Sequence, residues 1–506
     1  MLELLPEGEL EMRIIELNVT NYEYDVHAMV GAFFPGEQIK VQTPESKAVR
    51  DAGGHPSRVS VRLHDEGAVL DLDGAVYRWD WPGPGQQEHT PGNKVTDGVK
   101  YKEGFKRFLY QSLCEATGKT LPWGDLTGIR PTKIAFSLLE QGMDDEEIIK
   151  YYREKYFVGR EKAELSVGIA RRERELLSGI HGPKAGCGYS LYVGIPFCPT
   201  TCLYCSFTSF PIGGYRKMVD TYIDCLIREL EYAAGELKGD VLDCVYIGGG
   251  TPTTLEAGQL ERLLCALRRL FDFSSVKEFT VEAGRADSIT EEKLQVLYRY
   301  GVDRISINPQ TMIQKTLDII GRKASVAQVE EAYALARKVG FDNINMDLIL
   351  GLPGESEDDV RYTVGKVAGM APDSLTVHSL AVKRASMLNR WVQENGVSML
   401  RNTDETMRIA AEGAAGLGLV PYYLYRQKNM SGNFENVGYA REGKLGLYNI
   451  LIMEEVQTIL ACGAGSISKR VYPDGRIERC ENVKDVSQYI GRIGEMIERK
   501  HVLFGD

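Results

Sequence analysis

Between about residues 190 and 380, short apolar runs alternate with longer segments of helical periodicity. The apolar runs predict six strands. They cover residues 190–195, 243–247, 278–282, 304–307, 344–349 and 375–378. In one intervening segment, apolar residues from Val219 to Leu230 recur every three or four positions, which is typical of one buried helix face. Strands that alternate with helices predict a parallel sheet with right-handed crossovers.

The ends of the predicted helices carry the expected capping residues. Thr290 precedes two acidic residues and is placed to cap a helix that ends before Gly301. Gly340 ends the helix that follows Ser325 in the same way. The fold class is therefore α/β. Six strand–helix units predict a partial barrel, an open relative of the eightfold (β/α) barrel, with its site at the carboxyl ends of the strands.

The flanking regions follow other patterns. Residues 1–180 combine short, partly alternating strands near Arg13, Arg58 and Ala68 with a polar helical stretch that begins at Asp144, which predicts a separate α+β domain. We assign residues 181–384 to the partial barrel. Residues 385–506 mix helices and loops, and we expect them to cap the mouth of the barrel.

Composition narrows the class of protein. A chain of 506 residues is long enough for two or three domains, and its formal net charge of −11 argues against a general binder of nucleic acid or of anionic membranes. Ten cysteines in this length are too few for a disulfide scaffold. We expect no secretory signal at the N-terminus and no membrane span, so the expected location is the cytoplasm.

Three of the cysteines form a tight motif directly after the first predicted strand. Cys198, Cys202 and Cys205 have C-x-x-x-C-x-x-C spacing. Three thiolates can hold three irons of a cubane cluster and leave the fourth iron open for a cofactor. A structural zinc site would need a fourth Cys or His, and Phe207 stands where that ligand would be expected.

Polar or glycine-rich residues follow the other predicted strands. Gly248-Gly-Gly-Thr251 could bring backbone N–H groups close to a ligand. Glu282 is an isolated acid at the end of an apolar strand, where an unpaired buried charge would be costly, so it requires either a salt bridge or a ligand that offers a diol or an amine. Polar side chains also lie near the ends of later predicted strands, at Gln310, Arg322 and Asp347. His378 also ends a strand, where a single histidine is more often structural.

Together these residues resemble the radical S-adenosylmethionine (SAM) superfamily. The resemblance implies a 4Fe-4S cluster whose open iron is chelated by the methionine amine and carboxylate of SAM. An electron from the cluster then cleaves the sulfonium to a 5′-deoxyadenosyl radical, so that the cofactor supplies the difficult chemistry.

Longer motifs narrow the resemblance to one family. The chain is similar to the oxygen-independent coproporphyrinogen III oxidases, and its long N-terminal region makes it most similar to the HemZ-type members. The motifs that carry the similarity begin at Tyr192, Gly248, Ile305, Ile344 and Gly463.

The resemblance also implies roles for individual residues. The cluster-bound SAM would be contacted by Tyr192, Tyr204, Gly249 and Glu282. The mouth of the barrel at this site would also be lined by Gln310, Arg322, Asp347 and Ala381. Gly250 and Thr251 match positions that hold a second SAM, so one or two molecules are expected.

The implied reaction is the oxidative decarboxylation of two propionate side chains of coproporphyrinogen III to the vinyl groups of protoporphyrinogen IX. The implied partners are a tetrapyrrole and an electron donor such as flavodoxin or ferredoxin.

Two positions depart from the family's pattern. Gly194 replaces a histidine, and Phe207 replaces a fourth cysteine, as it does in the haem-chaperone branch. A haem-binding chaperone and another radical enzyme acting on a tetrapyrrole therefore remain as alternatives.

Overall fold

The computed structural model divides the chain into two compact units, each with a sheet of its own. The described residues are 12–35, 37–46, 57–82, 99–182, 188–383, 386–396, 399–427 and 434–505. The first unit comprises Met1–Val167, Asn389–Arg401 and Arg426–Phe434, and the second comprises Gly168–Leu388, Asn402–Tyr425 and Glu435–Asp506. The boundaries at 180 and 384 that we expect from the sequence remain predictions about separately folding domains.

The first unit is an α+β fold around a five-stranded sheet of order β2-β1-β3-β4-β5. Its elements are β1 (Met12–Leu17), α1 (Glu23–Phe33), β2 (Gln38–Gln42), β3 (Ser57–His64), β4 (Gly67–Leu72), β5 (Ala75–Asp80), α2 (Val99–Thr117), α3 (Thr132–Glu140) and α4 (Asp145–Tyr156). α5 (Arg160–Leu177) continues into the second unit, and α12 (Met387–Asn395) lies at another boundary between the units.

Alternating burial holds this sheet against its helices. Val59, Val61 and Leu63 of β3 are buried while the residues between them are more exposed, which gives the sheet one apolar face. The buried Tyr101 hydroxyl donates to the carbonyl oxygens of His64 and Gly67, at 2.8 and 2.6 Å, and so ties α2 to the β3–β4 turn. The α+β character predicted for this region is present.

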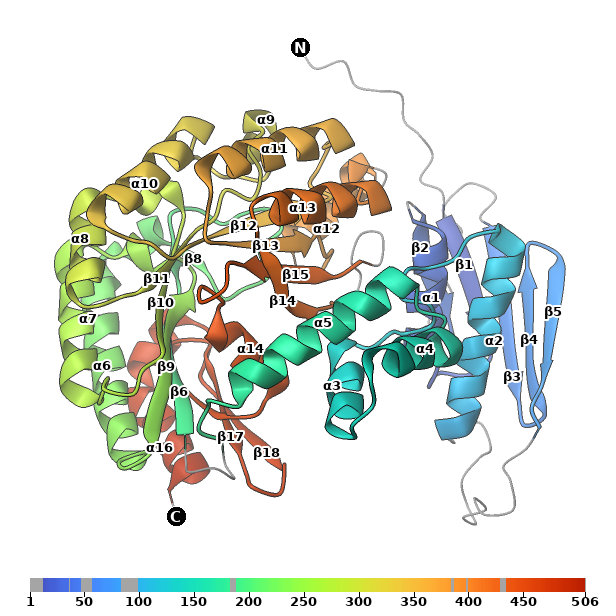
Figure 1. Ribbon diagram of the computed structural model, residues 1–506, viewed down its shortest axis with the longest axis horizontal. Helices are drawn as coiled ribbons and strands as arrows, with labels where there is room; N and C mark the ends of the chain where they lie inside the picture. Colours follow the sequence, from blue (N-terminus) through green and yellow to red (C-terminus); the bar gives the residue numbers. More distant parts are fainter. Residues whose placement is uncertain are drawn as a thin grey trace. The chain divides into compact units, whose positions relative to one another are not determined.

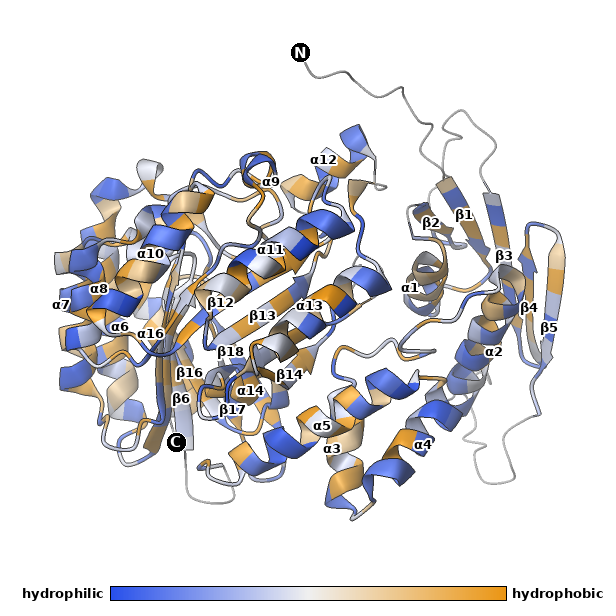
Figure 2. Ribbon diagram, turned by 45° about the horizontal axis from the view of Figure 1, so that its top comes forward, coloured by the Kyte–Doolittle hydropathy of each residue, from blue (hydrophilic) through white to orange (hydrophobic). Residues whose placement is uncertain are grey.

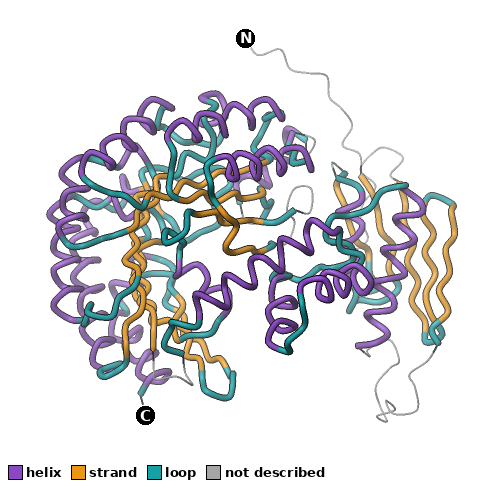
Figure 3. The backbone as a smooth tube through the Cα atoms, in the orientation of Figure 1, coloured by secondary structure: helices purple, strands orange, loops and turns teal. Residues whose placement is uncertain are grey.

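The second unit is built on an eleven-stranded open sheet of order β14-β15-β13-β12-β11-β10-β9-β6-β16-β17-β18 (Figures 1 and 3). Its six predicted strands are all present and parallel. They are β6 (Gly188–Ile195), β9 (Val241–Gly249), β10 (Glu278–Gly284), β11 (Arg304–Ile307), β12 (Ile344–Leu350) and β13 (Ser374–Ser379). The predicted α/β class with a six-stranded parallel core is confirmed.

Helices cover the outer side of this curved sheet (Figure 1). They are α6 (Val219–Glu236), α7 (Ala257–Leu270), α8 (Glu291–Arg299), α9 (Gln314–Ile319), α10 (Val326–Val339), α11 (Glu357–Met370) and α13 (Asp404–Gly416). Hydrophobic and hydrophilic stretches alternate along them (Figure 2), as half-buried helices require. The Thr290 side chain accepts from the Lys293 N–H, and Gly340 ends α10 with a positive φ of 120°, so the predicted N-cap and the predicted helix end are both present.

The region after residue 385 contributes strands as well as the expected helices and loops. These elements are β14 (Val420–Tyr425), β15 (Asn436–Ala440), α14 (Leu447–Glu454), β16 (Thr458–Cys462), β17 (Ile467–Val471), β18 (Ile477–Glu481), α15 (Val486–Gly491) and α16 (Ile493–Phe504). β15 pairs antiparallel with β13, and β16 pairs parallel with β6. The region therefore extends both edges of the parallel core, whose exposed N–H and C=O groups would otherwise lack partners.

A fully buried ion pair joins two helices of the second unit, α6 and α16. Lys500 Nζ on α16 lies 2.5 Å from Glu229 Oε1 on α6, with side-chain exposures of 1% and 0%. Tyr489 and Asn482 donate to the same carboxylate at 2.5 and 2.7 Å, and the Gly463 N–H donates to it at 2.8 Å. Because every oxygen of the buried carboxylate is occupied, the cost of desolvating it is offset.

In the part of the chain that the structure describes, no helix combines the length and the apolar character that crossing a bilayer requires.

We predict that Lys500→Met lowers the free energy of unfolding by about 3–5 kcal/mol, because it leaves Glu229 charged and unpaired in the interior. Urea unfolding followed by circular dichroism measures the change. Lys338, which pairs with Glu291 on the surface at 3.1 Å, is the control, and Lys338→Met should cost less than about 1 kcal/mol. Equal effects of the two substitutions would contradict the prediction.

Candidate functional site

Parallel pairing places the cysteine loop beside the glycine loop. In the β6–β9 register, Gly194 lies opposite Gly248 and Ile195 lies opposite Gly249, so both strands end at the same level. The cysteine loop continues from β6 through the short strand β7 (Phe197–Cys198), which pairs with β8 (Phe210–Pro211). The carboxyl ends of parallel strands are where α/β proteins bind ligands.

Backbone hydrogen bonds hold the two loops together at close range. The N–H groups of Gly250 and Thr251 donate to the carbonyl oxygens of Ile195 and Phe197, each at 2.7 Å. A Cβ atom on Gly250 would lie 2.5 Å from the Phe197 carbonyl oxygen, so any larger residue would push the loops apart. From the sequence we expect the N–H groups of the glycine run to face a ligand. The Gly250 N–H instead donates to the Ile195 carbonyl oxygen and is not available to a ligand.

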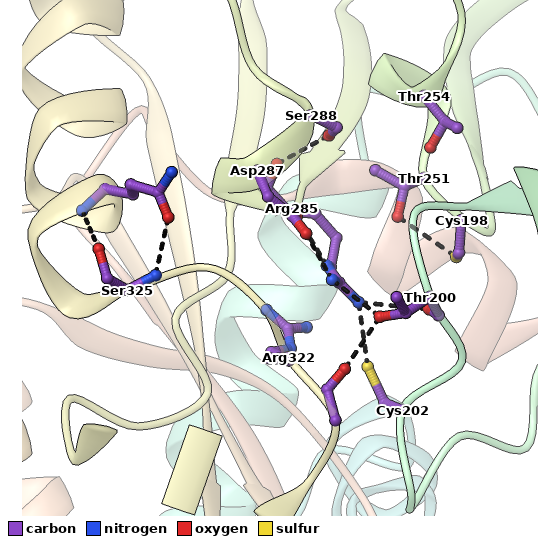
Figure 4. Close-up of polar contacts among 12 residues, drawn as sticks. Cys198, Thr200, Cys202, Thr251, Thr254, Arg285, Asp287, Ser288, Arg322 and Ser325 are labelled. Carbon is purple, nitrogen blue, oxygen red and sulfur yellow. Dashed lines mark hydrogen bonds and ion pairs between the residues drawn. The ribbon is translucent and has the colours of Figure 1, made fainter. Parts of the chain in front are cut away.

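The three cysteines are free and half-buried, and each sulfur has a polar neighbour. Cys198 Sγ lies 3.4 Å from Thr251 Oγ1, and Cys205 Sγ lies 3.5 Å from Ser209 Oγ. Cys202 Sγ accepts from Arg285 Nη1 at 3.5 Å (Figure 4). Burial raises the pKa of the Cys198 thiol to about 11.

Three thiols in one loop are the ligand type of a cubane iron–sulfur cluster. Among the described residues, no group of three or more His, Cys, Asp or Glu side chains converges on a point that could hold a single metal ion. A cubane needs no such convergence, because each thiolate binds a different iron. Two buried guanidinium groups, Arg285 and Arg322, lie beside Cys202 and would balance the negative charge of thiolate ligands.

Glu282 lies inside the second unit next to a stack of tyrosine rings. The Tyr246 hydroxyl donates to its carboxylate. The Tyr246 ring stacks on Tyr448 with centroids 4.5 Å apart and on Tyr192 with centroids 6.2 Å apart. Burial raises the pKa of Glu282 to about 7, although the hydrogen bond from Tyr246 opposes the shift. The carboxyl group is therefore held in a place that favours a cationic or hydrogen-bonding ligand.

Gln310 and Asp347 are held side by side through their backbones. The Gln310 N–H donates to the Asp347 carbonyl at 2.9 Å, and Gln310 has a positive φ of 68°, which is uncommon for a residue with a side chain. Gln310 Oε1 is buried without a hydrogen-bond partner. The Asp347 carboxylate accepts from Asn345 at 2.7 Å and lies 3.8 Å from His378 Nε2. An unsatisfied buried amide oxygen is a site where a ligand donor would be stabilising.

The remaining predicted residues lie along the same rim. Arg322 Nη2 donates to the Tyr204 hydroxyl at 3.3 Å, and Nη1 donates to the Asn308 carbonyl. Ala381 is half-buried and follows β13 by two residues. The structure thus brings Tyr192, Glu282 and Gly249 into one neighbourhood, since a Cβ on Gly249 would lie 3.4 Å from the Tyr192 hydroxyl.

Sequence reasoning missed three residues of this neighbourhood. Tyr246 lies on a predicted strand two residues before the glycine run, and its alternation with buried residues could have indicated an inward side chain. Arg285 follows Glu282 by three residues and could have been noticed as a charge at a strand end. Tyr448 comes from a distant helix and had no local signal.

Comparisons with known proteins agree with this geometry. The model of the radical SAM superfamily matches residues 192–367. The chain is 42% identical over 410 residues to the oxygen-independent coproporphyrinogen-III oxidase-like protein HemZ of Bacillus subtilis, covering 79% of this chain and 81% of that protein.

Two further relatives match over shorter lengths. Heme chaperone HemW of Lactococcus lactis is 36% identical over 217 residues, covering 43% of this chain and 55% of HemW. Oxygen-independent coproporphyrinogen III oxidase of Escherichia coli is 32% identical over 192 residues, covering 38% of this chain and 42% of that enzyme. The chain spans about half the length of these two relatives.

A solved structure shares the fold. The coproporphyrinogen III oxidase HemN of Escherichia coli superposes with a TM-score of 0.50 at 23% identity, covering 62% of this chain and 70% of HemN. The chain belongs to the radical SAM superfamily and, within it, to the oxygen-independent coproporphyrinogen III oxidase family that includes HemZ.

Proposed function

We propose that the protein is a radical SAM oxidoreductase that decarboxylates coproporphyrinogen III to protoporphyrinogen IX without oxygen. The proposal depends on one observation, the contact of 3.4 Å between Cys198 Sγ and Thr251 Oγ1. This contact holds the cysteine loop against the glycine loop at the ends of the strands. Membership of the HemZ-containing family supports the substrate class.

The superfamily implies a 4Fe-4S cluster and SAM, and we assign the cluster to Cys198, Cys202 and Cys205. When bound, the pair supplies a carbon-centred radical that can remove a hydrogen atom from an unactivated carbon. The chain's own residues then have three tasks: they hold the cluster, orient SAM and keep water away from the reacting carbon.

We assign SAM to the residues around the tyrosine stack. Glu282 would accept from the amine or a ribose hydroxyl of SAM, and Tyr192 would pack against it. Gln310 Oε1, which lacks a partner, would accept a hydrogen bond from the same ligand. Tyr204, Gly249, Arg322, Asp347 and Ala381 complete the proposed set. Gly250 and Thr251 are the proposed contacts of a second SAM, through side-chain and carbonyl atoms, because their N–H groups are bonded to Ile195 and Phe197.

Each propionate of the substrate loses one hydrogen atom from the carbon next to the ring and one carbon dioxide from its end. The electron that remains passes to an acceptor, and a low-potential protein such as flavodoxin or ferredoxin would reduce the cluster. We propose that this takes place in the cytoplasm.

A haem-chaperone function is the second candidate. Phe207, which replaces a fourth cysteine, is 76% exposed and lies two residues after Cys205. Similarity to heme chaperone HemW also favours this function. Anaerobic incubation with SAM, dithionite and coproporphyrinogen III separates the two candidates. Formation of protoporphyrinogen supports the oxidase, whereas stable haem binding without decarboxylation supports the chaperone and would overturn our proposal.

We predict that Cys202→Ala lowers the iron bound after anaerobic reconstitution at least about tenfold and abolishes turnover, because one iron loses its thiolate. Iron and sulfide analysis measures the loss. Cys265 on α7 is an exposed thiol, and Cys265→Ala should leave cluster content and turnover unchanged. Turnover that survived in Cys202→Ala would show that the cluster at these cysteines does not start the reaction.

We predict that Glu282→Gln removes a pH dependence of stability. In the wild type without ligand, the folded carboxyl has a pKa of about 7 against a reference of 4.5, so the folded state holds a proton that the unfolded state has lost. Stability therefore falls as pH rises from 4.5 to about 7 and stays low above it. The difference in unfolding free energy between pH 5 and pH 8 should shrink by about 2.5 kcal/mol in the variant, measured by urea unfolding.

The pH dependence of SAM binding by the wild type and by Glu282→Gln tests whether Glu282 contacts the cofactor. The Glu282 carboxylate binds the cationic ligand best when ionised, so SAM affinity should increase as pH rises through 7 in the wild type and change little in Glu282→Gln. Glu355 is the matched control. Burial raises its pKa to about 7 as well, but it bonds to Thr311. Glu355→Gln should alter stability without altering the pH profile of SAM binding, and matching profiles for all three proteins would refute the assignment.

A further inference from the structure

Arg285 is a buried cation that none of the assigned roles uses. It follows β10, and its side chain is only 3% exposed. Its Nη1 lies 3.5 Å from Cys202 Sγ and 3.3 Å from the Thr200 carbonyl oxygen. Figure 4 shows the side chain reaching from the strand end to the cysteine loop. Burying a charge is costly unless it is paired, and Asp287 pairs with this guanidinium at 2.7 Å, which leaves Nη1 to the cysteine loop.

Two further contacts fix the orientation of the guanidinium group. Asp287 accepts from Nε and Nη2 at 3.0 and 2.7 Å, which is the bidentate geometry that locks a guanidinium plane. Nη2 also donates to Thr200 Oγ1 at 3.1 Å, and that hydroxyl donates to the Gly321 carbonyl at 2.9 Å. Arg285 is therefore held with Nη1 directed at Cys202.

Two buried guanidinium groups, Arg285 and Arg322, lie beside the Cys202 sulfur, and Asp287 pairs with only one of them, Arg285. In a low-dielectric interior, two guanidinium groups repel each other unless negative charge lies nearby. A thiolate-ligated cluster at Cys202 would place negative charge beside both groups.

The other two cysteines have neutral partners. Cys198 faces the Thr251 hydroxyl and Cys205 faces the Ser209 hydroxyl. Among the described residues, the cationic donors to the cysteine sulfurs are thus concentrated on Cys202. Hydrogen bonds and charge near the sulfurs are the means by which proteins set the potentials of iron–sulfur clusters.

We propose that Arg285, held by Asp287 and Thr200, is a positioning residue that raises the reduction potential of the cluster through its hydrogen bond to Cys202. The step is a one-electron reduction of the cluster by a low-potential reductant, and the reduced cluster carries one more negative charge than the oxidised cluster. A fixed cation stabilises the more negative form, so the cluster accepts the electron more readily. The inference rests on the proposed cluster at the three cysteines.

A potentiometric titration with dithionite, followed by electron paramagnetic resonance of the reconstituted protein, tests this inference. Arg285→Gln should lower the equilibrium constant for one-electron reduction at least tenfold, which is about 59 mV toward negative potential. Asp287→Asn should shift the potential in the opposite direction, because it removes the negative charge that partly cancels Arg285. Arg285→Lys keeps the charge but loses the bidentate pair and should lie between Arg285→Gln and the wild type.

The control removes a guanidinium far from the cluster. Arg262 is 40% exposed and pairs with Asp220 and Asp224, so Arg262→Gln should leave the potential unchanged. If Arg285→Gln does not load a cluster, Asp287→Asn and Arg285→Lys decide the question by the sign of their shifts. If Arg285 had a purely structural role, Arg285→Gln and Asp287→Asn would not shift the reduction potential in opposite directions. The inference would be overturned if the equilibrium constant for one-electron reduction of both variants lay within twofold of the wild-type value.

The result also separates this inference from the function on which it depends. Wild-type protein that binds no cluster would overturn the proposed function together with the role of Arg285. A normal cluster whose reduction potential does not change in the Arg285 and Asp287 variants would overturn only the proposed role of Arg285.

Discussion

The parallel pairing of β6 with β9 is the interaction on which the candidate site depends. It stops both strands at the same level, so that the cysteine loop and the glycine loop leave the sheet side by side. The carbonyl oxygens of Ile195 and Phe197, on the cysteine side, are then bonded by N–H groups of Gly250 and Thr251. These bonds need a backbone approach that only glycine permits at position 250, which gives the glycine run a structural reason in addition to any role in binding.

Charge is distributed unequally on the two sides of this junction. Two buried arginines lie near Cys202, whereas a half-buried acid, Glu282, accepts a hydrogen bond from Tyr246 in the tyrosine stack. A cluster with thiolate ligands is anionic and SAM is cationic at its sulfonium, so each proposed ligand lies beside protein charge of opposite sign. Burial strengthens both interactions, because the effective dielectric constant is lower than in water.

The C-terminal region stabilises β6, the strand that precedes the cysteine loop. β16 pairs with β6 on the side opposite β9, and the Gly463 N–H that follows β16 is bonded to Glu229. The Tyr222 hydroxyl on α6 donates to the Gly194 carbonyl at 2.7 Å and accepts from the Ala464 N–H at 3.0 Å. A Cβ on Gly463 would lie 2.4 Å from the Gly194 carbonyl oxygen, so this approach also depends on a glycine. The last third of the chain therefore positions β6, the strand that leads into the cysteine loop.

Local patterns in the chain were enough to predict the six parallel strands, the N-cap at Thr290, the helix end at Gly340, and the three thiols in one loop, because each depends on residues close together in sequence. The strands of the last region were not predicted, since runs such as Thr458–Cys462 become strands only by pairing with the edge of an existing sheet. Tyr448 and Arg285 reach the site because distant strands and loops fold back onto β6, and Asp287 matters only once Arg285 is buried. Contacts between segments far apart in the chain decide which side chains meet at the strand ends and which charges surround each of them. Those contacts exist only in the folded molecule.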